Sequence, residues 1–290
     1  MRGKEYYSEE GIPIRTSIIL CGSLIVTLAG CNSISSTEER PVPVAGQEDP
    51  SPSESHPGND QPPAISSGQK SALEDQKLLT PEEVIQATKK QLHTTVPVQL
   101  PKSMDISVDH HLTAKTSSRS NEYTIQFIEM NEPVPINNGA LKNEEANVAV
   151  LRGMKYNSMS TAAKQINYQD HSDSEGEAVD LGFGIKGYKD AGAGSQFIGW
   201  NEGRWSLAMR ALTEQGDDLE AEAKKVVQYL EKHTLPVPHE AGMVMLDISK
   251  TGGEHVQRVA WQENNAVYEI ETPKGYMEAL KVAVSIQQNH

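Results

Sequence analysis

A long stretch without aromatic side chains limits how much of this 290-residue chain can form a core. Residues 32–122 contain no Phe, Tyr or Trp, and residues 32–72 hold seven of the 16 prolines among Ser, Glu and Gly residues. A segment of this composition buries too little apolar surface to offset the entropy that its backbone would lose on folding. We therefore predict a disordered tether over residues 31–72 and a folded part from residue 73 onward.

The tether is preceded by an uncharged, mostly apolar run at residues 17–29. A run of this length is typical of the core of a signal peptide and is too short to cross a bilayer as a helix. We therefore predict that residues 1–30 are a signal peptide, although residues 1–15 carry three acidic side chains beside three basic ones. The alternative is a buried strand or helix with an incidental cysteine, which the tether directly after the run disfavours.

The apolar run ends in Leu28-Ala29-Gly30-Cys31, which resembles the lipobox of bacterial lipoproteins. That resemblance implies cleavage before Cys31, transfer of a diacylglycerol to its thiol, and fatty acyl chains such as palmitate that hold the mature lipoprotein on the outer face of the cell membrane. A diacylated cysteine is a firm anchor, whereas a single acyl chain binds weakly. The only other cysteine, Cys21, lies in the predicted signal peptide, so the mature chain has no pair for a disulfide.

The net charge restricts the partners that the mature chain can bind. The formal net charge is −14, and residues 1–30 contribute nothing to it because their three acids and three bases cancel. Nucleic acid is therefore excluded as an expected partner, since its binding depends on Lys and Arg side chains that neutralise phosphates. The predicted partners are the membrane, through lipidated Cys31, and an envelope protein or a wall component.

The folded part begins with a well-marked helix. Thr80-Pro81-Glu82-Glu83 combines an N-cap, a proline at the first helical position and a glutamate that can return a capping hydrogen bond. A helix is expected from this point to about Leu92. Apolar runs then predict three strands, at residues 105–112, 123–130 and 147–151. A short helix is expected at residues 160–166.

Two later segments share a hairpin followed by a helix. Trp200 and Trp261 occupy equivalent positions in the first strand of each hairpin, and each following helix carries an apolar stripe. The first predicted hairpin covers residues 196–209 and its helix residues 217–233. The second hairpin covers residues 257–270 and its helix residues 276–287. We therefore predict an α+β fold with antiparallel sheets covered by helices, in two similar halves, residues 73–176 and 177–290, with repeated β-hairpin-helix units.

The Trp261 hairpin with its short closing helix, together with the lipobox, resembles the uncharacterised extracytoplasmic domains of lipoproteins from spore-forming Gram-positive bacilli. A related hairpin-helix module occurs outside the membrane in some anti-sigma factors. The resemblance covers about residues 80–287. It implies a surface or sensory role and brings no catalytic residues with it.

Three motifs are similar to cofactor sites without meeting their requirements. Asp109-His110-His111 is similar to the Asp-His-His motif of manganese phosphoesterases, but the earlier aspartate pair of that family has no counterpart. Residues 182–187 have the glycine spacing of a dinucleotide-binding turn, yet residues 188–194 cannot begin the helix that holds a pyrophosphate. Residues 170–180 resemble a calcium loop but lack its final glutamate. We predict no cofactor and no metal site.

Tryptophans next to a cell wall could form a platform for sugar rings. Trp200 and Trp261 hold equivalent places in the two hairpins, which is better explained by packing beneath the helices. Trp205 has no counterpart in the second hairpin, and Arg204 and Arg210 lie near it in sequence. We therefore predict ligand binding at Trp205, Arg204 and Arg210.

The sequence contains no recognisable catalytic constellation. It has no Gly-x-Ser-x-Gly elbow and no His-Glu-x-x-His pair, and lipidation of Cys31 leaves no cysteine nucleophile. We predict a non-enzymatic binding or sensory domain at the cell envelope. The alternatives are a cell-wall hydrolase that uses a carboxylate pair and, more weakly, a transporter-linked solute receptor, for which the chain shows no sign of two doubly wound lobes.

Overall fold

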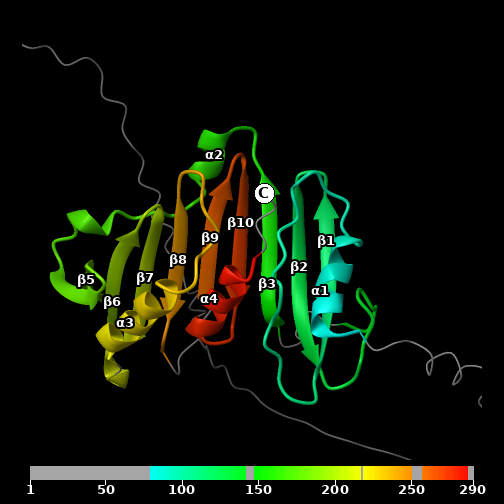
Figure 1. Cartoon of the computed structure of the whole chain (residues 1–290), viewed down its shortest axis with the longest axis horizontal. Coiled ribbons are helices and arrows are strands. Elements are labelled where there is room, and N and C mark those ends of the chain that lie inside the picture. Colours follow the sequence, from blue (N-terminus) through cyan, green and yellow to red (C-terminus); the bar gives the residue numbers. More distant parts are fainter. Residues whose placement is uncertain (1–78, 142–146, 217, 250–256, 287–290) are drawn as a thin grey trace, which may run out of the picture. The chain divides into compact units, whose positions relative to one another are not determined.

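The computed structural model describes residues 79–141, 147–216, 218–249 and 257–286. The predicted signal peptide, Cys31 and the tether lie outside these ranges. The described residues form one ten-stranded sheet in the order β1-β2-β3-β10-β9-β8-β7-β6-β5-β4, and α1, α3 and α4 lie on the same face of it (Figure 1). Within these ranges, no helix has the length and apolar character needed to cross a membrane.

The first helix begins as the sequence predicts. The Thr80 hydroxyl accepts from the Glu83 N–H at 3.2 Å, and the Glu83 carboxylate accepts from the Thr80 N–H at 2.9 Å. This reciprocal cap fixes the start of the helix and the direction in which the chain enters it. The elements of this region are α1 (Pro81–Lys89), β1 (His111–Arg119), β2 (Glu122–Met130), β3 (Asn147–Lys155) and α2 (Met159–Ala163).

The strand predicted at residues 105–112 is wrong. Residues 108 and 109 form a turn, and β1 begins only at His111. Asp109 has a φ of 61°, a left-handed backbone conformation that interrupts an extended run. The apolar residues before this turn, Met104 and Ile106, pack on the core from an irregular segment.

Both predicted hairpins and the helices after them are present. Asp218 caps α3 by accepting from the Ala221 N–H at 3.0 Å, while α4 starts at Gly275 without a side-chain cap. The remaining elements are η1 (His171–Asp173), β4 (Glu177–Gly182), β5 (Ile185–Gly192), β6 (Ser195–Glu202), β7 (Trp205–Leu212), η2 (Thr213–Gln215), α3 (Leu219–Leu230), β8 (Gly242–Asp247), β9 (Gln257–Glu263), β10 (Ala266–Thr272) and α4 (Tyr276–Val284).

The predicted antiparallel sheets are one mixed sheet in the structure, in which β7 and β8 are parallel. β10 pairs with β3 from Ala266 to Glu271, so strands from both predicted halves lie in one sheet. This pairing covers two edges whose N–H and C=O groups would otherwise lack partners. β8 runs parallel to β7 because α3 crosses between them and brings the chain back to the same end of the sheet.

The main core lies between the sheet and its three covering helices. Trp200 and Trp261 are 0% exposed, which confirms that both pack beneath the helices. Successive strand residues point to opposite faces, so the alternate positions of the same strands form the other face. Other large side chains in the main core are Tyr123, Phe127, Tyr268 and Met209.

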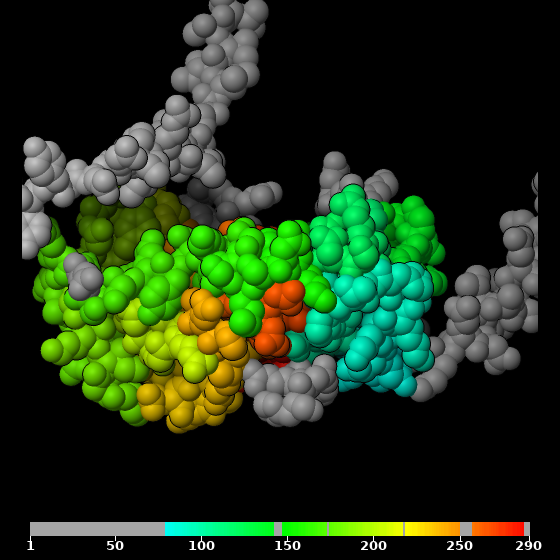
Figure 2. Space-filling view, turned by 90° about the horizontal axis from the view of Figure 1, so that it is seen from above, coloured from blue at the N-terminus to red at the C-terminus, as the bar shows by residue number. Residues whose placement is uncertain are grey.

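The opposite face of the sheet carries a network of ion pairs. Arg152 contacts Glu269 at 2.8 Å and Glu271 at 2.5 Å, and Arg258 contacts the same two carboxylates from the neighbouring strand. The green segment that contains α2 lies over the ends of the orange central strands (Figure 2), where the Gln262 amide donates to the Met159 carbonyl at 3.1 Å. A small apolar cluster, Ile166, Met243 and Ala260, is packed separately from the main core.

We expect Gly153→Ala in β3 to lower the free energy of unfolding by about 1–3 kcal/mol, the usual cost of overpacking a core. A Cβ at this position would lie 2.3 Å from Cε1 of Tyr123, whose ring is buried. Gly192→Ala in β5 is the matched control, because its Cβ would meet no atom within 4 Å. Urea unfolding of both variants tests this, and equal stabilities would contradict the tight β2–β3 packing.

Candidate functional site

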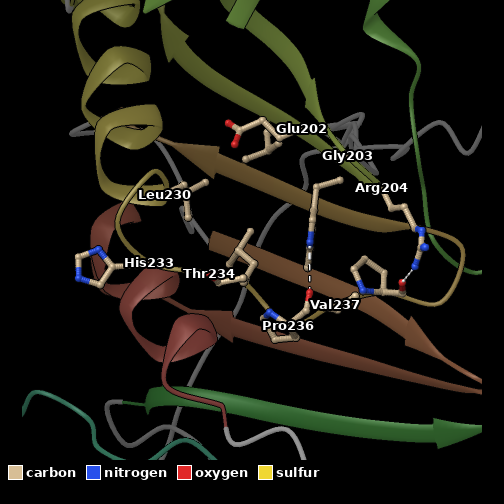
Figure 3. Close-up of a pocket in the computed structure, with 12 residues that line it drawn as sticks. Glu202, Gly203, Arg204, Leu230, His233, Thr234, Pro236 and Val237 are labelled. Carbon is tan, nitrogen blue, oxygen red and sulfur yellow. Dashed lines mark hydrogen bonds between the residues drawn. The ribbon is translucent and has the colours of Figure 1, made fainter. Parts of the chain in front are cut away.

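A pocket of about 280 Å³ opens on the helix-covered side of the sheet, between the β6–β7 turn and the C-terminal end of α3 (Figure 3). Residues 234–238, which lead from α3 toward β8, form its third wall. Most of its lining is apolar. The lining residues are Glu202, Gly203, Arg204, Trp205, Leu207, Leu230, His233, Thr234, Leu235, Pro236, Val237 and Pro238.

Two hydrogen bonds hold the proline-rich wall against β7. The Trp205 indole N–H donates to the Pro236 carbonyl at 3.2 Å, and Arg204 Nη1 donates to the Pro238 carbonyl at 2.7 Å, as the dashed lines in Figure 3 show. Trp205 is 7% exposed, and Gly242 of β8 lies against its ring, where a Cβ would come within 2.5 Å of Cε3. Trp205 is therefore a rigid, largely buried wall of the pocket.

Glu202 is the one acidic side chain in the lining. Its carboxylate is half-buried and accepts the indole N–H of Trp200 at 2.7 Å. Burial raises the pKa of Glu202, the Trp200 hydrogen bond offsets part of this rise, and the nearby charge of Glu231 adds to it. Among the described residues, no Lys, Arg or His forms an ion pair with Glu202.

His233 lies at the end of α3 and is exposed. Its ring stacks on Tyr229 with the ring centroids 4.1 Å apart, and its Nδ1 lies 2.9 Å from the Tyr229 carbonyl. These contacts fix the ring on the outer side of the helix end. Figure 3 shows Glu202 and Leu230 on the side of α3 and Arg204 on the opposite side of the pocket.

The structure brings two of the three predicted ligand-binding residues together. Trp205 and Arg204 line the pocket, whereas Arg210 lies on the other face of the sheet, five residues along β7 from Trp205. Arg210 Nη1 contacts Asp247 at 2.5 Å, and its Nε donates to Ser195 at 3.1 Å. The structure therefore does not bring Arg210 together with Trp205 and Arg204.

Two parts of the pocket were missed by the sequence analysis. Glu202 follows Trp200 by two residues, just as Glu263 follows Trp261, and this repeated spacing was a signal for an indole–carboxylate hydrogen bond. The segment 234–238 alternates proline with apolar residues. Because proline has no N–H, this segment can serve as a wall that accepts hydrogen bonds through its carbonyls.

Residues 182–187 contain the end of β4, a two-residue turn at Phe183 and Gly184, and the start of β5, and φ is positive from Gly182 to Gly184. A second strand follows this turn, so the helix needed for a dinucleotide site is absent from this described segment, as the sequence predicts. In residues 170–180, the segment that resembles a calcium loop, the His171 ring packs closely on Gly199. A Cβ added to Gly199 would lie 2.3 Å from this ring. Within the described ranges, no group of three or more His, Cys, Asp or Glu side chains is arranged to hold a metal ion.

We expect Glu202→Gln to increase stability relative to the wild type more at pH 7 than at pH 5. The amide oxygen can still accept from Trp200, while the charge that burial disfavours is removed. Because the folded state raises the pKa of Glu202 above its ordinary value of 4.5, the wild type recovers stability as the pH falls toward that value. Urea unfolding at both pH values measures the difference, and a gap that widens on acidification would contradict the burial of this carboxylate.

Comparison with known proteins gives no match to this chain, either among protein families, among curated proteins or among solved structures.

Proposed function

We propose that this chain is a lipoprotein that displays a non-enzymatic binding or sensory domain on the outer face of the cell membrane. The observation that carries the proposal is the placement of Leu28-Ala29-Gly30-Cys31 between an apolar run and a proline-rich tether. In this proposal, residues 1–30 are removed, Cys31 carries the lipid, and the tether over residues 31–72 separates the folded part from the membrane. About forty residues of flexible chain span roughly 35 Å.

The pocket beside Trp205 supports a binding role for the folded part. Its walls are apolar and held in place by the hydrogen bonds of Trp205 and Arg204, and its polar groups are few, which is typical of ligand sites. An envelope protein or a wall component is the proposed partner. The high net negative charge of the chain disfavours nucleic acid.

We also propose that the fold has two similar halves, residues 73–176 and 177–290, and that the second half contains two copies of a hairpin-helix unit. The units β6–β7–α3 and β9–β10–α4 each bury a tryptophan in their first strand. Trp200 donates to Glu202 at 2.7 Å, and Trp261 donates to Glu263 at 3.1 Å. The same hydrogen bond at the same spacing supports a common origin.

A cell-wall hydrolase is the second candidate, and one feature favours it. Glu202 is a half-buried carboxyl with a raised pKa beside a pocket, and the charge of Glu231 acts on it, as in the acid pairs of glycosidases. Glu263 makes the equivalent hydrogen bond to Trp261 and also binds the amide of Gln99 at 2.9 Å, which favours a structural role for this carboxylate position. Turnover of purified muropeptides that Glu202→Gln abolishes would establish the hydrolase.

Anchoring is tested with two cysteine variants of the full-length chain. We expect Cys31→Ala to move the protein from the membrane fraction to the soluble or secreted fraction, because no residue remains to accept the lipid. Cys21→Ala is the matched control and should leave the protein in the membrane fraction, since Cys21 lies in the predicted leader. Cell fractionation with immunoblotting makes the comparison.

A Cys31→Ala protein that stays with the membrane after its leader has been removed would contradict lipid anchoring. An equal loss of both cysteine variants from the membrane would also contradict it, because the effect would then not be specific to Cys31.

A further inference from the structure

The carboxylate of Glu202 differs from three other partly buried carboxylates of the fold, which each have a cation beside them, and from Glu263, which also accepts from the Gln99 amide. Glu129 binds Lys274 at 2.6 Å, Glu220 binds Lys189 at 2.6 Å, and Asp247 binds Arg210 at 2.5 Å. Among the described residues, Glu202 accepts only the neutral indole N–H of Trp200. A carboxylate that is partly removed from water without a counter-ion costs free energy, which a bound cation would recover.

We propose that this pocket binds an alkylammonium group, such as a lysine side chain, with its ammonium at Glu202 and its alkyl stem along the apolar wall. The inference rests on the proposed binding function and names the chemical class of its ligand.

The end of α3 adds to the negative potential at this side of the pocket. The last carbonyls of a helix carry a partial negative charge that basic side chains commonly offset. The last turn of α3 contains no basic residue, whereas the last turns of α1 and α4 contain Lys89 and Lys281. Glu231, the first residue after α3, acts on Glu202 in the same direction.

The two basic side chains in the lining, Arg204 and His233, are directed elsewhere. The Arg204 guanidinium lies on the opposite side of the pocket and donates to the Pro238 carbonyl (Figure 3). The His233 ring stacks on Tyr229 at the end of α3. The position next to Glu202 is thus left to a cation from outside the described residues.

The wall beside Glu202 suits the alkyl part of such a ligand. Leu230, Leu235 and Pro236 line the pocket, and Val237 is 56% exposed at its rim. Long ammonium side chains commonly lay their methylene groups on apolar surface and keep the charge at a polar end.

The test uses two probes that differ only in the ammonium group, Nα-acetyl-lysine amide and Nα-acetyl-norleucine amide. Both are titrated into the chain from residue 31 onward, and the tryptophan indole resonances are followed by NMR. Glu202→Gln removes the proposed partner of the ammonium. Glu263→Gln is the matched control, because Glu263 makes the same hydrogen bond to a tryptophan outside the pocket.

We expect the lysine probe to shift the Trp205 indole resonance in the wild type and in Glu263→Gln. It should bind Glu202→Gln at least about tenfold more weakly, since a hydrogen bond to a charged group is lost. The norleucine probe should bind the wild type at least about tenfold more weakly than the lysine probe does.

Equal binding of the two probes would overturn the ammonium inference while leaving an apolar binding site at Trp205. Absence of any shift with the lysine probe, or its undiminished binding to Glu202→Gln, would also overturn the inference. If Glu202→Gln does not fold, the inference is tested by the wild type alone, where the lysine probe must bind at least about tenfold more tightly than the norleucine probe. The membrane anchoring of Cys31 is measured separately, so its failure is distinguishable from the failure of this inference.

Discussion

The burial of two indole rings in the sheet is the interaction on which the rest of this fold depends. Trp200 in β6 and Trp261 in β9 are both 0% exposed, and α3 and α4 pack on the hairpins that contain them. An indole can be buried at this depth only if its N–H finds an acceptor. A glutamate two residues along the same strand provides that acceptor in each case, which fixes the end of the strand as well as the ring.

The two hairpins differ at the carboxylate that accepts the indole N–H, and the pocket arises from that difference. The side-chain amide of Gln99, from the segment after α1, donates to Glu263 and occupies the position beside it. Glu202 has no such neighbour among the described residues. The hydrogen bonds of Trp205 and Arg204 instead hold the segment after α3 as the opposite wall of the pocket. The carboxylate is therefore enclosed in the β9–β10 hairpin, whereas in the β6–β7 hairpin it lines the pocket.

Local chemistry in the sequence predicted the helices and both tryptophan hairpins, while β4, β5, β8 and the pairing between distant segments were not predicted from it. The cap at Thr80 and the equivalent tryptophans follow from short-range rules, and both agree with the structure. The pairing of β10 with β3 joins segments more than a hundred residues apart, and no local pattern specifies it. The side of the sheet on which Arg210 lies could have been predicted, because residues five positions apart in a strand point to opposite faces. The acceptor role of Glu202 could be predicted only by comparing the residues that follow the two tryptophans, which place a glutamate two positions along in each hairpin.

The mass of the mature N-terminal peptide tests the account most directly, because the proposed function depends on where the chain is cleaved and modified. The protein would be extracted from membranes of a bacterium that expresses the full-length chain, digested and analysed by mass spectrometry. Lipid anchoring predicts an N-terminal peptide that begins at Cys31 and carries a diacylglycerol. An unmodified Cys31, or a mature chain that begins at another residue, would contradict it.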